Sequence, residues 1–199
     1  MNIAIFASGN GSNLQAIINA VKKRTLKCNI ALVVSDNPKA FALKRARKAG
    51  IKTFYLDPKL FKTREAYDSA VIAEIENYDI ELIVLAGFMR ILSGHFVKKY
   101  SGSVMNVHPS LLPAFKGTHG IKDAFLYGVK VTGVTVHFVD DKLDHGPVIL
   151  QEPVEVEKKD TLVTLEKKIH KTEHKLYPIA IKLFVSGKLR VKGRIVKIG

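Results

Sequence analysis

The chain has 199 residues, of which 47% are hydrophobic, and its formal net charge is +14 at pH 7. This length suits one globular domain, the lack of any apolar run of about 18 residues excludes a membrane span, and the single Cys28 excludes an internal disulfide. Because the basic residues are scattered and there is no tryptophan, we expect a solvated basic surface that attracts anionic small substrates, and we do not expect a nucleic-acid partner.

The start of the chain carries no pattern of a secretory signal. Met1 leads directly into an apolar run, without the basic start and the cleavage site that such a signal needs. Together with the single cysteine, this predicts a cytoplasmic protein.

The first 108 residues alternate short apolar runs with segments of helical periodicity. The predicted strands are 2–7, 29–34, 52–56, 81–86 and the segment that ends at 108. One predicted helix starts after residue 13, and three more cover 41–49, 63–77 and 93–100. Such an alternation is typical of right-handed parallel crossovers.

The second part of the chain follows a different pattern. A helix is predicted at 118–126, an antiparallel pair of strands at 130–139 and 148–156, a long helix from 160 or 161 to 185, and a hairpin at 189–198. We therefore predict a single-domain, Rossmann-like α/β fold over residues 1–199. Its mixed sheet is parallel in the N-terminal part and antiparallel at the C-terminal strands, with helices on both faces.

The segment "SGNGSN", residues 8–13, lies between the first predicted strand and helix. Glycine lets backbone N–H groups approach a ligand, and the helix start with Ser12 and Asn13 suits a phosphate. A dinucleotide fingerprint would need a third glycine where Leu14 stands, so a monophosphate is favoured. The alternative is a tight turn without a ligand.

Three predicted parallel strands end in polar or glycine-containing segments, namely residues 8–13, residues 87–92 and the pair Asn106 and His108. The two side chains of this pair share one face because they stand two positions apart on a strand. In open α/β sheets ligands bind beyond the carboxyl ends of the strands. The sequence therefore indicates a site at this edge.

The loop within "HFVDDKLDHGPVI", residues 137–149, contains Asp140, Asp141 and Asp144. A solvated loop is the simplest interpretation of the first two, and the spacing is not that of a calcium loop. If Asp144 lies against His108, the set provides an amide donor, an acid or base, and a carboxylate that orients the imidazole. No activated Ser or Cys joins this set, so direct attack by a bound amine on an acyl carbon fits better than a covalent intermediate.

Five collinear segments carry a resemblance to a known family: "SGNGSNLQAI", "LAGFMRIL", "VMNVHPSLLPAFKG", "GVTVHFVDDKLDHGPVILQ" and "TEHKLYP". On these segments the sequence resembles the phosphoribosylglycinamide formyltransferases, folate-dependent enzymes of purine synthesis, over nearly its whole length. The resemblance implies transfer of a formyl group from 10-formyltetrahydrofolate to the amine of 5'-phosphoribosylglycinamide, without a metal.

The resemblance also implies roles for individual residues. Asn106, His108 and Asp144 would be catalytic. The phosphate of the ribonucleotide would be bound by Gly11, Ser12 and Asn13. The same substrate would also be faced by His170 and Glu173. The folate would be bound by Arg64, Met89, Arg90, Ile91, Leu92, Asn106, Asp140, Asp141, Lys142, Leu143 and Asp144.

Other functions remain open at this point. Methionyl-tRNA formyltransferase shares the machinery but carries a C-terminal tRNA domain, for which 199 residues leave no room. Formyltetrahydrofolate hydrolase resembles the chain around Asn106 but usually carries an N-terminal regulatory domain. A nucleotide-binding Rossmann module is a different class, against which the missing third glycine and the Asn-His-Asp set argue. We expect small-molecule substrates, no membrane partner, and a monomer or a homodimer.

Overall fold

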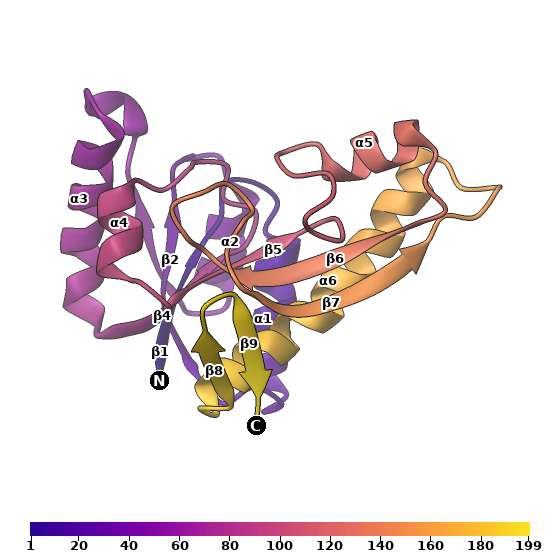
Figure 1. The fold of residues 1–199 in the computed structure, drawn as a ribbon. Coiled ribbons are helices and arrows are strands. Elements are labelled where there is room, and N and C mark those ends of the chain that lie inside the picture. Colours follow the sequence, from indigo (N-terminus) through magenta and orange to yellow (C-terminus); the bar gives the residue numbers. More distant parts are fainter. The chain divides into compact units, whose positions relative to one another are not determined.

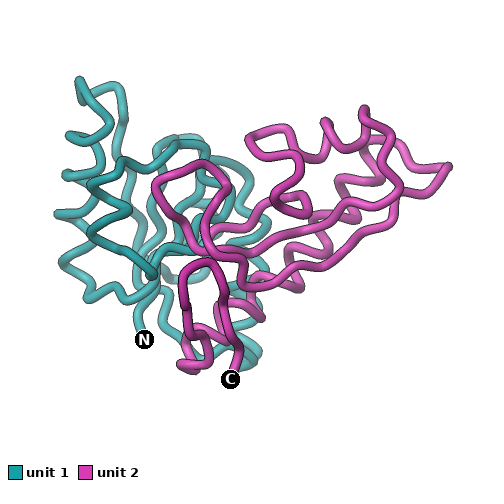
Figure 2. The backbone as a smooth tube through the Cα atoms, viewed as in Figure 1, with its two compact units in different colours: residues 1–105 teal, residues 106–199 magenta.

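The computed structural model describes all residues, 1–199, and they form two compact units, residues 1–105 and 106–199 (Figure 2). Both units combine helices with strands of a mixed sheet, and the predicted α/β class is confirmed. Strand β5 (Val104–His108) carries the chain from the first unit into the second. The prediction of a single domain over residues 1–199 stays a prediction.

The first unit contains a parallel sheet with the strand order β3-β2-β1-β4 (Figure 1). Its elements are β1 (Asn2–Phe6), α1 (Ser12–Lys22), β2 (Asn29–Ser35), α2 (Phe41–Lys48), β3 (Lys52–Tyr55), the 3₁₀ turn η1 (Pro58–Leu60), α3 (Arg64–Ile75), the 3₁₀ turn η2 (Glu76–Tyr78), β4 (Ile80–Leu85) and α4 (Gly94–Lys99). The inner strands are almost entirely buried, as parallel strands covered by helices are. Their apolar runs were therefore readable in the sequence.

Helices α3 and α4 of the first unit begin at residues whose side chains satisfy a backbone N–H group of the first turn. The Thr63 hydroxyl accepts a hydrogen bond from the Ala66 N–H at 3.1 Å, and the Ser93 hydroxyl accepts one from the Phe96 N–H at 3.3 Å. Helices α3 and α4, which these caps start, lie side by side (Figure 1).

The second unit contains the antiparallel pair that the sequence predicted. Its elements are α5 (Gly120–Tyr127), β6 (Val131–Phe138), β7 (Val148–Glu155), α6 (Leu162–Val185), β8 (Leu189–Lys192) and β9 (Ile195–Ile198). Strands β6 and β7 pair antiparallel, with Val136 opposite Leu150, and β8 and β9 form the predicted C-terminal hairpin. Residues 132–138 of β6 are buried throughout, whereas in β7 only Ile149 and Val154 are buried and every second residue from 151 to 155 is exposed. Strand β7 therefore has one solvated face.

Helix α6 packs along β6 and β7 (Figure 1). Thr161 starts it with a capping box: its hydroxyl accepts from the Thr164 N–H, and the Thr164 hydroxyl accepts from the Thr161 N–H. Its buried face includes Leu165, Ile169 and the carboxylate-bearing Glu173. Burying an aliphatic side chain of this kind contributes about 1.5–3 kcal/mol, so α6 is held mainly by packing.

The predicted elements agree with the structure to within two residues. The segment predicted as a helix over 63–77 ends as an α-helix at Ile75 and continues as the turn η2, and the helix predicted from 118 begins at Gly120. Helix ends fray, so their boundaries are the least predictable feature of a helix. None of the helices combines the length and the apolar character that crossing a membrane requires.

Candidate active site

The end of β5 places His108 in a buried position where both of its ring nitrogens have a partner. Its Nε2 lies 2.8 Å from the Phe115 carbonyl oxygen, and its Nδ1 lies 3.4 Å from Asp144 Oδ2; the His108 side chain is only 4% exposed. A carbonyl oxygen can only accept a hydrogen bond, so Nε2 carries a proton and donates it to Phe115. The carboxylate of Asp144 then faces the other ring nitrogen, Nδ1.

Asp144 and Phe115 both hold His108 from left-handed backbone conformations. Their φ angles are 46° and 49°, in a region that non-glycine residues seldom adopt. The carboxylate of Asp144 is buried and also accepts a hydrogen bond from the Gly117 N–H at 2.8 Å. Strain of this kind costs of order 1–3 kcal/mol and persists where surrounding contacts hold the backbone, as they do here.

A second histidine, His137 on β6, orients the amide of Asn106. His137 Nδ1 donates to the Phe138 carbonyl oxygen at 2.7 Å, and burial lowers the pKa of His137, which its hydrogen bond with Phe138 and the charge of Asp144 oppose without cancelling. In the neutral ring Nε2 is an acceptor, so it accepts from Asn106 Nδ2 at 3.3 Å. Asp144 Oδ1 lies 3.9 Å from the same Nε2, but a neutral ring makes no ion pair.

The sequence analysis did not single out His137. Its one signal was a histidine within a β-branched strand, which is most often a structural residue. The residue becomes meaningful only through Asn106, which is 31 positions away in the chain. A contact of this kind cannot be read from periodicity.

Two glycines of the second unit allow close approaches around this cluster. A Cβ at Gly120 would lie 3.3 Å from His108 Nε2 and 2.9 Å from the Phe115 oxygen, and a Cβ at Gly146 would overlap the Phe138 carbonyl oxygen. Glycine is therefore needed where α5 begins beside the imidazole and where the loop after Asp144 turns back.

The loop over residues 140–145 is partly ordered by its own side chains. Asp140 accepts hydrogen bonds from His145 Nδ1 at 2.7 Å and from the Lys142 N–H at 3.1 Å. Burial raises the pKa of Asp140, but these hydrogen bonds and the charge of Arg194 outweigh it, so the pKa lies below its ordinary value. The Asp140 carboxylate is thus hydrogen-bonded within the loop rather than freely solvated, whereas residues 141–143 are exposed.

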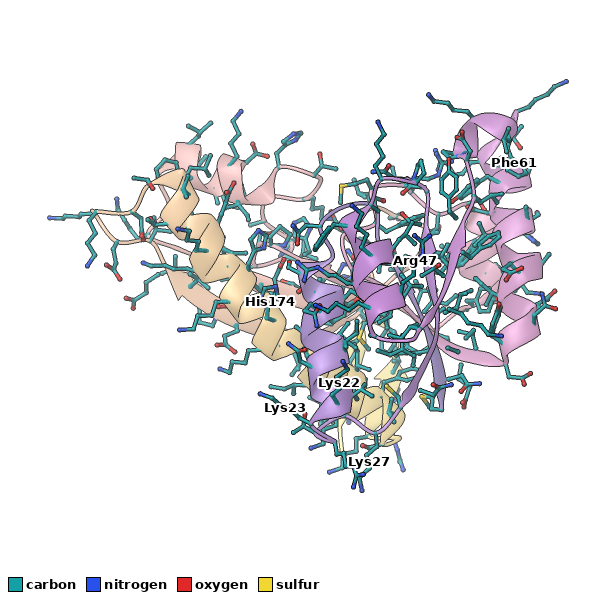
Figure 3. All side chains as sticks on the ribbon, turned by 180° about the vertical axis from the view of Figure 1, so that it is seen from behind. Lys22, Lys23, Lys27, Arg47, Phe61 and His174 are labelled. Carbon is teal, nitrogen blue, oxygen red and sulfur yellow. The ribbon has the colours of Figure 1, made fainter.

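On α6, the structure brings His170 and Glu173 together. His170 Nδ1 lies 3.0 Å from Glu173 Oε2, with Glu173 buried and His170 half exposed. The hydrogen bond to Glu173 raises the pKa of His170, and burial opposes this rise. One turn along, the ring of His174 stacks on that of His170 with 6.4 Å between centroids; Figure 3 labels His174 on α6.

In the first unit, the predicted phosphate turn is built tightly against α2. Gly11 has φ 72°, and a Cβ there would lie 2.7 Å from the Ala42 Cβ, so only glycine fits. Arg45 donates to the Asn10 carbonyl oxygen at 2.9 Å, to Asn10 Oδ1 at 3.0 Å and to Gln15 Oε1 at 3.2 Å. The sequence analysis missed this role of Arg45 because its partners lie 30 or more positions away.

Ser12 and Asn13 follow as the first residues of α1, and the N-terminal end of a helix carries a partial positive charge that favours an anion. Asn13 is buried, and Ser12 is partly exposed. The first turn of α1 holds no acidic residue that would compete with an anion. The phosphate site at this turn stays a prediction.

The segment 87–92 adjoins the phosphate turn within the first unit. The Ser8 hydroxyl accepts from the Met89 N–H at 2.9 Å, and the Ser8 N–H donates to the Gly87 carbonyl oxygen. Met89 and Ile91 are exposed, whereas Leu92 is buried. The Arg90 guanidinium lies over the Tyr67 ring at 4.5 Å, and Arg64 is exposed at the start of α3.

The cluster of Asn106, His108 and Asp144 supports proton transfer and oxyanion stabilisation. The Ser110 hydroxyl donates to the Ala114 carbonyl oxygen, and burial raises the pKa of the Cys28 thiol to about 11, so neither is an activated nucleophile. No group of three or more His, Cys, Asp or Glu side chains is arranged to hold a metal ion. An oriented amide and an imidazole beside a carboxylate suit charge that develops on an oxygen.

Comparisons with known proteins identify the family of the chain. A family model described as formyl transferase matches residues 1–181. The chain is 45% identical over 179 residues to a phosphoribosylglycinamide formyltransferase from Bacillus subtilis (strain 168), covering 90% of this chain and 92% of that protein.

Longer relatives and solved structures extend the comparison. The chain is 47% identical over 191 residues, or 96% of its length, to the trifunctional purine biosynthetic protein adenosine-3 from Gallus gallus, of which it spans 19%. The crystal structure of glycinamide ribonucleotide transformylase 1 from Symbiobacterium toebii superposes with a TM-score of 0.97 and 41% identity, covering 100% of this chain and 93% of that one. The chain therefore belongs to the formyl transferase family.

Proposed function

We propose that the chain transfers the formyl group of 10-formyltetrahydrofolate to the amine of 5'-phosphoribosylglycinamide, giving formylglycinamide ribonucleotide and tetrahydrofolate. The observation that carries this proposal is the set of the partly buried Asn106 and the buried His108 and Asp144, in which the amide is oriented by His137. The names of the relatives support the choice of substrates.

In the proposed reaction the amine nitrogen attacks the formyl carbon. A C–N bond forms, negative charge develops on the formyl oxygen, and the bond from that carbon to N10 of the folate then breaks. The proton lost by the amine balances the proton gained by N10. Asn106, with one amide N–H beyond that given to His137, and the protonated ring of His108 stabilise the oxyanion.

For His108 the structure suggests how this occurs. Its Nε2–H donates a hydrogen bond to the Phe115 carbonyl oxygen. In the proposed mechanism the formyl oxygen replaces that carbonyl as acceptor while Asp144 stays beside Nδ1. Asp144 stabilises the imidazolium and assists proton transfer toward the leaving nitrogen.

The binding residues are proposed on the same basis. The ribonucleotide phosphate binds at Gly11, Ser12 and Asn13, and the pair of His170 and Glu173 faces the remainder of that substrate. The folate is bound by Arg64, residues 89–92, Asn106 and residues 140–144. The exposed side chains of Met89, Ile91 and Leu143 support an apolar contact with the folate.

The test measures tetrahydrofolate formation by absorbance, with and without 5'-phosphoribosylglycinamide. We expect turnover only when the ribonucleotide is present. His108→Ala should lower kcat by about 10²–10⁴, the range for a lost general acid. The matched control is His95→Ala, which removes an exposed histidine on α4.

Two outcomes would contradict the proposal. Formate release that is independent of the ribonucleotide would identify a hydrolase, and NAD binding without turnover would identify a nucleotide-binding module. A folded His108→Ala variant with near-normal kcat would remove His108 from the mechanism.

A further inference from the structure

We propose that Arg194, in the turn between β8 and β9, is a positioning residue that holds the loop of Asp144 in place. We call Arg194, His145 and Asp140 the hairpin latch. The role assigned to Asp144 rests on the proposed function, but the contacts of the latch do not.

The latch is a continuous chain of contacts within the second unit. Arg194 Nη2 donates to the His145 carbonyl oxygen at 2.7 Å, and Arg194 Nη1 lies 3.2 Å and 3.1 Å from the two ring nitrogens of His145. His145 Nδ1 lies 2.7 Å from Asp140 Oδ2. The C-terminal hairpin is thereby connected to both ends of the segment 140–145.

The geometry fixes how the guanidinium meets the imidazole. A nitrogen equally close to both ring nitrogens cannot lie in the ring plane without colliding with the carbon between them, so the guanidinium covers the ring face. That arrangement leaves His145 Nδ1 free to donate to Asp140. The carboxylate of Asp140, whose pKa is lowered, balances the charge of Arg194 across the ring.

The latch acts on Asp144 because Arg194 binds the backbone of the next residue, His145. The carbonyl oxygen that Arg194 binds belongs to His145, the next residue, and Asp144 itself has a left-handed φ of 46°. After His145, Gly146 lies so close to the Phe138 carbonyl oxygen that no side chain fits. Asp144 is thus held from the residue after it, while its carboxylate reaches His108 and the Gly117 N–H.

Charge-assisted hydrogen bonds contribute more than neutral ones, and the bond from Arg194 to the His145 carbonyl, at 2.7 Å, is shorter than the bond from the Lys142 N–H to Asp140, at 3.1 Å. Without the bond from Arg194 the strained Asp144 can relax, and its carboxylate then loses its position between Gly117 and His108. Catalysis would fall although no group that touches the substrate had been removed.

The experiment compares Arg194→Ala with Arg190→Ala. Both substitutions remove one positive charge from the same hairpin, and Arg190 is an exposed residue of β8. The first readout is hydrogen exchange at the Gly117 amide, which reports the position of Asp144 without any substrate. We expect exchange to accelerate about tenfold or more in Arg194→Ala, the effect of losing a hydrogen bond to a charged group, and to be unchanged in Arg190→Ala.

The second readout is kinetic. In Arg194→Ala kcat should fall while KM for the ribonucleotide stays unchanged, and Arg194→Lys should recover part of the loss. His145→Ala keeps the backbone carbonyl that Arg194 binds, so it should affect Gly117 exchange less than Arg194→Ala does.

Unchanged Gly117 exchange in a folded Arg194→Ala variant would overturn the proposal, and so would equal effects of Arg194→Ala and Arg190→Ala. A larger effect of His145→Ala would transfer the role to the imidazole and also overturn it. If wild type does not transfer formyl groups, the exchange result still decides whether the latch positions Asp144, so the two failures are distinguishable.

Discussion

Two buried histidines lie beside Asp144, and the partners of their nitrogens give them different tasks. His137 donates through Nδ1 to a carbonyl and accepts through Nε2 from Asn106, so it must be neutral. His108 donates through Nε2 to a carbonyl, and its Nδ1 faces the carboxylate of Asp144. One imidazole is a fixed acceptor that orients an amide, and the other is the proposed proton donor.

The neutral state of His137 has a consequence for stability against acid. Because the pKa of His137 is lowered in the folded chain, the unfolded chain binds a proton more readily once the pH drops below the ordinary value of about 6.5. Stability should therefore fall as the pH falls from 7 toward the lowered pKa. In His137→Gln this contribution is removed, and the loss of stability between about pH 7 and pH 5 should be smaller.

The measurement is a set of urea unfolding midpoints across that pH range, with His95→Gln as an exposed control. The raised pKa of His170 contributes in the opposite direction, because its stabilisation is complete below about 6.5 and is lost as the pH rises, but this contribution is present in all three proteins. An identical acid slope in wild type and His137→Gln would show that His137 is not held neutral by burial.

At the scale of elements, α6 depends on its first turn and on one buried face. Thr161 and Thr164 close the capping box, and Lys168 forms an ion pair with Asp160 at 2.6 Å just before the helix. The same helix carries Glu173 in its buried face. The first turn therefore adds local contacts to a helix that is held mainly by packing.

Thr161→Ala removes the hydroxyl that accepts the hydrogen bond from the Thr164 N–H and should lower the free energy of unfolding by about 1 kcal/mol. Thr161→Ser keeps the hydroxyl and should recover most of that loss. Chemical denaturation checks both variants. Equal stabilities of the alanine and serine variants would mean that the hydroxyl does not cap α6.

The elements were largely predictable because their signals are local. The apolar run of β4 and the cap at Thr63 lie within the segments that they define. The turn η2 was not predicted, because its helical periodicity continues that of α3. For the candidate site, strand ends pointed to Asn106 and His108, but His137, Arg45 and Arg194 act through partners distant in sequence, and no local pattern indicates such partners.

At the scale of the whole molecule, the excess of positive charge is spread over helix surfaces. Between residues 1 and 52 the only acidic side chain is Asp36. Lys22, Lys23 and Lys27 gather near the C-terminal end of α1, and Arg47 extends from α2 (Figure 3). A field of one sign raises the local concentration of anionic small molecules, and salt screens it.

We therefore expect kcat/KM for the proposed anionic substrates to fall several-fold as KCl rises from about 20 mM to about 500 mM, while kcat changes little. A variant with Lys22→Gln, Lys23→Gln and Lys27→Gln should show a weaker salt dependence and the same kcat. Steady-state kinetics across the salt series provide the measurement. A salt-independent kcat/KM in wild type would mean that the charge has no part in substrate capture.

The contacts of Arg45 and the exclusion of any side chain at Gly11 have an entropic consequence. Three hydrogen bonds from one guanidinium and the close approach to Ala42 restrict the phosphate turn before any ligand arrives. A turn that is already ordered loses little conformational freedom on binding, so less of the interaction free energy is spent on ordering the backbone. The close packing that excludes a side chain at position 11 would thus also favour binding of the proposed phosphate.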